Sequence, residues 1–127
     1  MKKILINGYL GKMGQSLLGV INNTKNYELI YSVDINSDNS EKKSNSFNNI
    51  KKDLISDIDC VVDFSNSKGF VDSSEFAIRN SIPFVSGSTG YSNEDLENIK
   101  KMHSENKVGI ALCSNFSTGA ILLAHFG

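Results

Sequence analysis

Three glycines follow the first apolar run of the sequence at intervals of three residues. Gly8, Gly11 and Gly14 lie in the segment INGYLGKMGQ, directly after the run ILI. In a turn between a strand and a helix, the first glycine permits a tight bend, the next lets the backbone approach a phosphate, and the last lets helix and strand pack closely. Amide groups at the start of the helix then face the phosphates, aided by the helix dipole. The pattern indicates a phosphate-binding turn. Because the middle glycine departs from the spacing G-x-G-x-x-G, a tight turn without a ligand stays an alternative.

An acidic residue stands where a second strand is expected to end. Asp34 closes the segment LIYSVD, twenty residues after Gly14, close to the spacing expected for the acid that accepts hydrogen bonds from the ribose of a dinucleotide. The plain alternative is a solvated aspartate at a strand end. The next residue is Ile35 and not arginine, which removes the simplest partner for a ribose 2′-phosphate. We therefore expect NADH to be used at least as well as NADPH, with Lys42 and Lys43 as the remaining candidates to hold that phosphate.

Short apolar runs alternate with segments of helical period along the chain. The runs predict strands at 3–7, 29–34, 59–64, 83–87 and 108–113, and the periodic segments predict helices at 12–23, 69–80 and 92–106. In the last of these, Ser92 can cap the helix and Asp95 can answer it three residues later. Apolar strands separated by helices imply a parallel sheet that is covered on both sides. The expected fold class is therefore α/β, a Rossmann-type doubly wound, mostly parallel sheet with helices on both faces.

Two segments depart from this alternation. Residues 36–49 contain a single apolar residue, Phe47, and are dense in Ser and Asn, so they are predicted to form a solvated loop. The segment STGAILLAHFG, residues 117–127, begins like a capped helix and is still apolar where the sequence stops. We expect the chain to be part of a longer polypeptide.

Three small, hydroxyl-rich segments follow the remaining predicted strands. They are DFSNSKG (63–69), GSTGY (87–91) and CSNFSTG (113–119). Ligands in open parallel sheets lie beyond the carboxyl ends of the strands, so these segments together are expected to form the wall of a cleft. Each alone is an ordinary turn with a helix cap, at Ser65 or Ser67 before one helix and at Ser117 or Thr118 before another.

The motifs GYLGKMG, VVDFS, GSTGY and SNFSTG, in this order and spacing, resemble the nucleotide-binding domain of the 4-hydroxy-tetrahydrodipicolinate reductase family, also called dihydrodipicolinate reductase. The likeness covers essentially the whole chain. It implies hydride transfer from NADH or NADPH to a cyclic unsaturated imine dicarboxylate, giving tetrahydrodipicolinate in lysine and diaminopimelate biosynthesis. It also implies that residues 1–127 are the NAD(P)-binding domain, without the second, catalytic domain of the family. For full-length members of the family, the resemblance implies a homotetramer. The oligomeric state of this segment is not predicted.

The resemblance further implies a set of site residues. Those expected to wrap the pyrophosphate are Gly8, Tyr9, Leu10, Gly11, Lys12 and Met13. Asp34 is expected to bind the ribose, with Asp63 and Phe64 near the adenosine, where the Phe64 ring is expected to belong to the core more than to stack on the ligand. Those expected to line the nicotinamide end are Gly87, Ser88, Thr89, Cys113, Ser114, Asn115 and Phe116, with Thr89 also close to the substrate.

No residue of the chain is expected to be catalytic. In the family, the proton donor and the cationic anchors for the dicarboxylate come from a His- and Lys-rich motif and a Pro-Ser-Gly-Thr segment of the second domain, which this sequence lacks. His103 is expected to be solvated on a helix, His125 lies in the final apolar stretch, and Arg79 is expected at the surface. Two hypotheses result: the cofactor half of the reductase, or a stand-alone NAD(P)-binding redox-sensing or regulatory module. The nicotinamide-side loops favour the first.

Composition and charge argue against several other kinds of binding partner and site. The net charge is −1, and the thirteen basic residues, of which twelve are lysine, are scattered, so neither nucleic acid nor an anionic membrane is an expected partner. No apolar stretch approaches the ~20 residues of a membrane span. No metal-ligand spacing is present. Cys60 and Cys113 each lie in an apolar run, which predicts buried thiols in a reducing compartment, and we expect a cytoplasmic protein.

Overall fold

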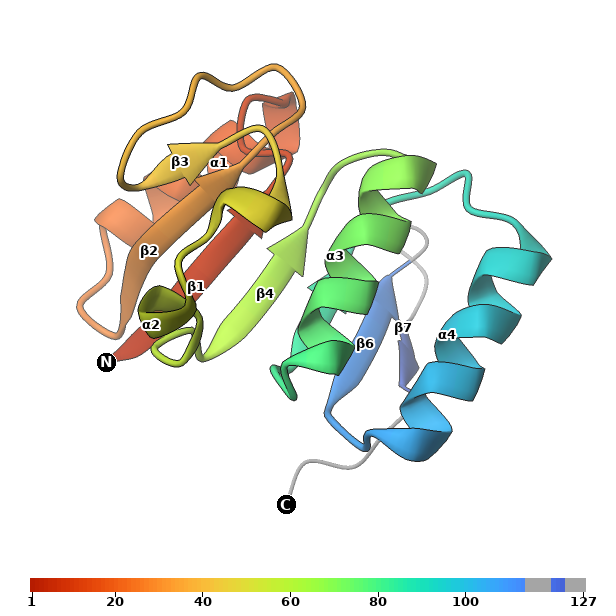
Figure 1. The fold of residues 1–127 in the computed structure, drawn as a ribbon. Coiled ribbons are helices and arrows are strands. Elements are labelled where there is room, and N and C mark those ends of the chain that lie inside the picture. Colours follow the sequence, from red (N-terminus) through yellow and green to blue (C-terminus); the bar gives the residue numbers. More distant parts are fainter. Residues whose placement is uncertain (114–119, 123–127) are drawn as a thin grey trace.

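The computed structural model of the chain describes residues 1–113 and 120–122 (Figure 1). Its strands are β1 (Lys2–Asn7), β2 (Tyr27–Val33), β3 (Lys43–Ser44), β4 (Cys60–Asp63), β5 (Phe84–Ser86), β6 (Ile110–Cys113) and β7 (Ala120–Leu122). Its helices are α1 (Lys12–Asn22), α2 (Lys52–Ile55), α3 (Ser67–Arg79) and α4 (Asn93–Glu105), with a 3₁₀ turn, η1, at Phe47–Asn49.

All these strands belong to one sheet, in the order β3-β2-β1-β4-β5-β6-β7. Neighbours from β3 to β6 pair in parallel, and β7 pairs antiparallel to β6. The chain runs outward from β1 through β2 to β3 and then returns to the other side of β1 with β4. The strand order therefore reverses between β1 and β4, and in open α/β sheets this switch point is where ligands bind.

Alternate residues of β1 enter two separate cores. Ile4 and Ile6 pack on one face of the sheet with Ile21 of α1, whereas Leu5 packs on the other face with Phe70 of α3. Helices α3 and α4 lie together on this second face (Figure 1). The predicted class, a mostly parallel doubly wound sheet with helices on both faces, is confirmed.

Helices α3 and α4 begin with side-chain caps. Ser92 and Asp95 form the predicted capping box of α4. At α3 the cap is Asn66, whose side chain accepts from the amide of Gly69 at 2.9 Å. The prediction of Ser65 or Ser67 as that cap is wrong, because the Ser65 hydroxyl donates to Asp63 instead.

The segment 36–49 is only partly the predicted loop. It contains β3, which extends the sheet by pairing with Ser32 and Val33 of β2, and η1. The Phe47 ring packs on Phe76 of α3 with ring centroids 4.8 Å apart. Phe47, the single apolar residue of the segment, thus anchors it to the second core.

The end of the chain also differs from its prediction. Residues 120–122 form the edge strand β7, not a helix, and pair with residues 111–113 of β6. A short antiparallel strand satisfies backbone groups that β6 would otherwise leave unpaired at the sheet edge. Ser117 and Thr118, the expected caps of that helix, lie outside the described residues. Within the described residues, no helix combines the length and apolar character needed to cross a membrane.

Candidate functional site

The glycine turn after β1 is built as its spacing predicts. Gly8 has φ +85°, and a Cβ there would lie 2.6 Å from the carbonyl oxygen of Phe64, so only glycine fits. A Cβ on Gly14 would overlap the Gly8 carbonyl oxygen. At Gly11, however, a Cβ would meet only that same oxygen, at an ordinary 3.4 Å. The fold therefore requires glycine at 8 and 14 but not at 11.

Helix α1 begins without a side-chain cap. Its N-cap is Gly11, and no acidic residue lies in its first turn, whereas α3 and α4 are capped by Asn66 and Ser92. The first amides of a helix have no partner within it. At α1 these donors, and the positive end of the helix dipole, are left for an anion.

Asp34 follows β2 and is hydrogen-bonded to the glycine turn. Its Oδ2 accepts from the backbone amide of Leu10 at 3.1 Å, and its Oδ1 accepts from the amide of Asn36 at 3.0 Å. The residue is only 9% exposed. Two fixed amides therefore orient the carboxylate beside the turn.

A cleft of about 1150 Å³ opens over the carboxyl ends of β1, β2 and β4. Its walls are the glycine turn, residues 33–36, residues 45–48, part of the segment 50–55, the loop 64–66 and one side of α3. The predicted site residues that line it are Gly8, Leu10, Gly11, Asp34 and Phe64. Phe64 is half-buried and lies at the cleft wall, and the expectation that its ring belongs to the core more than it stacks on the ligand stays a prediction.

Tyr9 belongs to the turn, but its side chain points away from this cleft. The ring packs in the first core with Ile4 and Ile6, and its hydroxyl is 2.8 Å from Oγ of Ser37. Any contact of Tyr9 with a ligand in the cleft is therefore made by its backbone. Lys12 and Met13, in the first turn of α1, are exposed and do not line the cleft.

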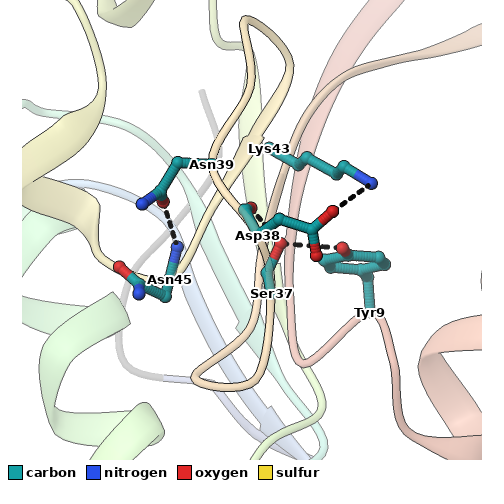
Figure 2. A network of polar contacts seen from close by, with 6 residues as sticks. All are labelled: Tyr9, Ser37, Asp38, Asn39, Lys43 and Asn45. Carbon is teal, nitrogen blue, oxygen red and sulfur yellow. Dashed lines mark hydrogen bonds and ion pairs between the residues drawn. The ribbon is translucent and has the colours of Figure 1, made fainter.

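The segment that Tyr9 holds carries its own polar network (Figure 2). Ser37 donates to the carbonyl of Asp38 at 2.6 Å, and the Asp38 carboxylate pairs with Lys43 at 3.7 Å. Asn39 accepts from the amide of Asn45 at 3.1 Å. Neither Lys42 nor Lys43 lines the cleft.

Asp63 lies fully buried at the end of β4 and accepts hydrogen bonds from side chains of three segments. Oδ1 accepts from Nδ2 of Asn7 at 3.1 Å and from the hydroxyl of Ser65, and Oδ2 accepts from Ser86 at 2.9 Å and Ser88 at 2.6 Å. Burial raises the pKa of Asp63, and the hydrogen bonds from the serines oppose that rise. Asn7 and Ser86 are not among the residues predicted from the sequence; the signal for them was an acid inside the apolar run VVDFS.

The GSTGY loop is attached to the same strand end. The amide of Gly87 donates to the carbonyl of Asp63 at 2.8 Å, Ser88 is buried, and Thr89 is exposed. Tyr91 stacks on Phe70 with centroids 4.2 Å apart. The loop is thus fixed at both ends, with Thr89 outward between them.

Of the last predicted site residues, the structure describes only Cys113. Cys113 ends β6, and Ser114, Asn115 and Phe116 lie outside the described residues, as does His125. The prediction that these residues line the nicotinamide end stays a prediction.

Three further side chains singled out by the sequence are His103, Arg79 and Cys60. His103 is half-buried and bonds the carbonyl of Val108 at 3.0 Å, at the opposite end of the sheet from the cleft, so it is not the solvated residue expected. Arg79 is at the surface, as predicted, 3.8 Å from Glu75. Cys60 is a free, half-buried thiol whose pKa is raised to about 11 by burial and by Asp59. Within residues 1–113 and 120–122, no group of three or more His, Cys, Asp or Glu is arranged to hold a metal ion.

The comparisons by sequence, with a family model and with curated relatives, point to one family. The family model described as dihydrodipicolinate reductase, N-terminus, matches residues 2–116. The chain is 32% identical over 125 residues to a 4-hydroxy-tetrahydrodipicolinate reductase of Streptococcus uberis, covering 98% of this chain and 49% of the relative. It is 30% identical to that of Lactobacillus helveticus, covering 98% and 50%. The chain spans about half the length of these curated relatives.

Solved structures show the same fold. A dipicolinate-bound dihydrodipicolinate reductase from Paenisporosarcina sp. TG-14 superposes with a TM-score of 0.73 at 24% identity, over 91% of this chain and 48% of that one. The WlbA dehydrogenase from Thermus thermophilus, in complex with NAD and UDP-GlcNAcA, gives 0.69 at 13% identity, over 88% and 41%.

Proposed function

The chain belongs to the dihydrodipicolinate reductase family, and from this premise we propose that it is the cofactor-binding domain of an NAD(P)H-dependent reductase. The proposed reaction reduces 4-hydroxy-tetrahydrodipicolinate, a cyclic unsaturated imine dicarboxylate, to tetrahydrodipicolinate in lysine and diaminopimelate biosynthesis. The names of the relatives support this assignment. A cytoplasmic location is part of the proposal and is supported by the free thiol of Cys60.

One observation carries the cofactor proposal. A single cleft is bordered by the uncapped start of α1, by Gly11, where the fold does not need a glycine, and by the Asp34 carboxylate. The residues present therefore fit a dinucleotide. The first amides of α1 would hold the pyrophosphate, the missing side chain of Gly11 lets it come close, and Asp34 would accept hydrogen bonds from the ribose hydroxyls.

When bound, the reduced nicotinamide supplies the hydride. The chain's own residues bind and orient the cofactor and keep water from its reactive end. Gly87, Ser88 and Thr89 are the proposed nicotinamide-side residues among those described, with the exposed Thr89 also close to the substrate. Ser88 would contribute through its backbone, because its hydroxyl already donates to Asp63 and accepts from the Ser65 amide.

We further propose that NADH is used at least as well as NADPH. A ribose 2′-phosphate would face the Asp34 carboxylate, which would repel the phosphate. The residue next to Asp34 is Ile35, which carries no charge, is 68% exposed and lines the cleft. Lys43 is paired with Asp38 outside the cleft. The cations that do line the cleft, Lys52, Lys68 and Arg79, belong to α2 and α3 and not to the end of β2.

The proton donor and the anchors for the dicarboxylate are proposed to come from a second domain. Coverage of about half of each relative supports this division, and so does the location of His103 at the far end of the sheet. A stand-alone sensing module is the competing hypothesis. Sequencing the gene beyond the codon of Gly127 separates the two: a downstream His- and Lys-rich motif with a Pro-Ser-Gly-Thr segment supports the reductase, and a stop codon contradicts it.

Cofactor binding is tested by isothermal titration calorimetry of the chain with NADH, NADPH and ADP-ribose. We expect all three to bind and NADH to bind at least as tightly as NADPH. Failure of NADH and ADP-ribose to bind would overturn the proposed function.

A further inference from the structure

Asp63 is a fully buried carboxylate to which the proposed cofactor contacts assign no task. It ends β4, the strand at the switch point of the sheet. Its register partners are Asn7 on β1 and Ser86 on β5, so the three residues form a row across three adjacent strands. A buried charge is costly unless it is fully hydrogen-bonded. Of this row, Asn7 lines the cleft.

The two oxygens of Asp63 serve different loops. Oδ1 accepts from the side-chain amide of Asn7 at 3.1 Å, from the backbone amide of Ser65 at 3.3 Å and from the Ser65 hydroxyl. Asn7 directly precedes Gly8 of the glycine turn. Oδ2 takes the hydroxyls of Ser86 at 2.9 Å and Ser88 at 2.6 Å. One carboxylate thus joins the adenosine-side turn to the GSTGY loop.

The two serines also accept hydrogen bonds from backbone amides. The amide of Ser65 donates to Oγ of Ser88 at 2.9 Å, and the amide of Ser88 donates to Oγ of Ser86 at 3.1 Å. Each serine oxygen thus accepts from a backbone amide while its hydroxyl donates to Oδ2 of Asp63. Oδ2 accepts twice, as a carboxylate oxygen can.

We propose that Asp63 is a positioning residue that, through Ser88, holds the loop Gly87–Thr89 so that the nicotinamide end of the cofactor is fixed relative to the adenosine end. The proposal rests on the proposed function. Asp34 and Leu10 lie at the end of β2 and in the glycine turn and are joined to each other directly, so the adenosine end keeps its own anchors when the Ser88 link is cut. The two ends of the cofactor are then separable by mutation.

The test compares Ser88→Ala with Ser74→Ala in the chain. Ser88→Ala removes one donor to Oδ2 and the acceptor of the Ser65 amide. Ser74 is equally buried, but its hydroxyl bonds the carbonyl of Val71 in its own helix, at 3.0 Å, so it controls for loss of a buried hydroxyl. NADH and ADP-ribose are titrated by calorimetry, and the fluorescence of the reduced nicotinamide reports whether its ring leaves water.

For Ser88→Ala we expect NADH to bind roughly tenfold more weakly, the scale of a buried hydrogen bond. The nicotinamide fluorescence change should be reduced, while ADP-ribose affinity stays within about twofold. Ser74→Ala should leave the ratio of the two affinities unchanged. The role of Asp63 is overturned if Ser88→Ala loses affinity equally for both ligands or for neither, or if the wild-type chain binds NADH no more tightly than ADP-ribose. These outcomes leave the proposed function standing. Only a wild-type chain that binds neither ligand contradicts the proposed function itself.

Discussion

The backbone amide of Leu10 donates a hydrogen bond to Oδ2 of Asp34 at 3.1 Å, which joins the turn after β1 to the end of β2. The second oxygen accepts from the amide of Asn36 at 3.0 Å. Each carboxylate oxygen can accept more than one hydrogen bond, so the contact orients Asp34 and still leaves lone pairs toward the cleft. Two features that the sequence separates by more than twenty residues thus act as one binding element.

Substituting Asp34→Asn tests this element. The amide keeps the size of the side chain and one acceptor oxygen but removes the charge, so NADH and ADP-ribose should both bind more weakly by ~1–3 kcal/mol, the cost of a charge-assisted hydrogen bond. Calorimetry measures the affinities, and thermal unfolding verifies the fold. Unchanged affinity in a folded variant would show that the ribose is bound elsewhere.

Gly11→Val separates binding from folding. Because a Cβ at this position meets only the Gly8 carbonyl oxygen at 3.4 Å, the melting temperature should change little, whereas the side chain obstructs the approach of the pyrophosphate and abolishes NADH binding. The matched variant is Gly14→Ala, whose Cβ would overlap the Gly8 carbonyl oxygen, so it should lower the melting temperature. NADH binding that survives in Gly11→Val places the pyrophosphate away from this turn.

Ile35→Arg should shift the cofactor preference. Ile35 is exposed at the cleft wall beside Asp34, where a guanidinium can reach a ribose 2′-phosphate. We expect the affinity for NADPH relative to NADH to rise roughly tenfold, about 1.4 kcal/mol. Lys43→Ala is the control, since Lys43 is paired with Asp38 outside the cleft and its loss should leave the ratio unchanged. A fall in NADPH affinity in that control would assign the phosphate to Lys43.

The features that sequence alone predicted are those set by neighbours along the chain. The conformational roles of Gly8 and Gly14, the capping box of Ser92 with Asp95, and helices α1, α3 and α4 all follow from spacing over a few residues. Their boundaries in the structure differ from the predicted ones by two residues or fewer at each end.

The features that sequence alone missed depend on strands far apart in the chain. The partners of Asp63 come from β1 and β5, and only the strand register brings Asn7 and Ser86 to its two oxygens. The ring of Tyr9 packs in the core with Ile4 and Ile6, which a motif alone does not reveal. The apolar residues 120–122 satisfy a helical or a strand pattern equally, and pairing with β6 decides between the two.

The raised pKa of Cys60 predicts a thiol that reacts slowly with alkylating reagents at neutral pH. With a pKa of about 11, the thiol stays protonated at neutral pH, and alkylation by iodoacetamide should be slow until the pH approaches that value or the chain unfolds. Between the ordinary thiol pKa of 9.0 and the folded-state pKa of about 11, the folded state binds more protons than the unfolded state, so stability should fall as pH rises through this range. Mass spectrometry of the Cys60 peptide measures the reaction. Rapid labelling of that peptide at pH 7 in the folded chain would contradict the assignment.

Ser81→Gly should stabilise the fold. Ser81 follows α3 with φ 55°, the left-handed conformation that glycine adopts without cost. Its amide donates to the carbonyl of Ile78 at 3.1 Å, and the next amide, of Ile82, donates to Ala77 at 2.8 Å, which is the pair of bonds of a Schellman motif. Relief of the side-chain strain should outweigh the extra chain entropy of glycine and raise the free energy of unfolding by ~0.5–1 kcal/mol. Thermal and urea unfolding measure the change, and Ser56→Gly, at the right-handed C-cap of α2, should not stabilise the chain. A loss of stability in Ser81→Gly would mean that the serine side chain contributes more than its backbone strain costs.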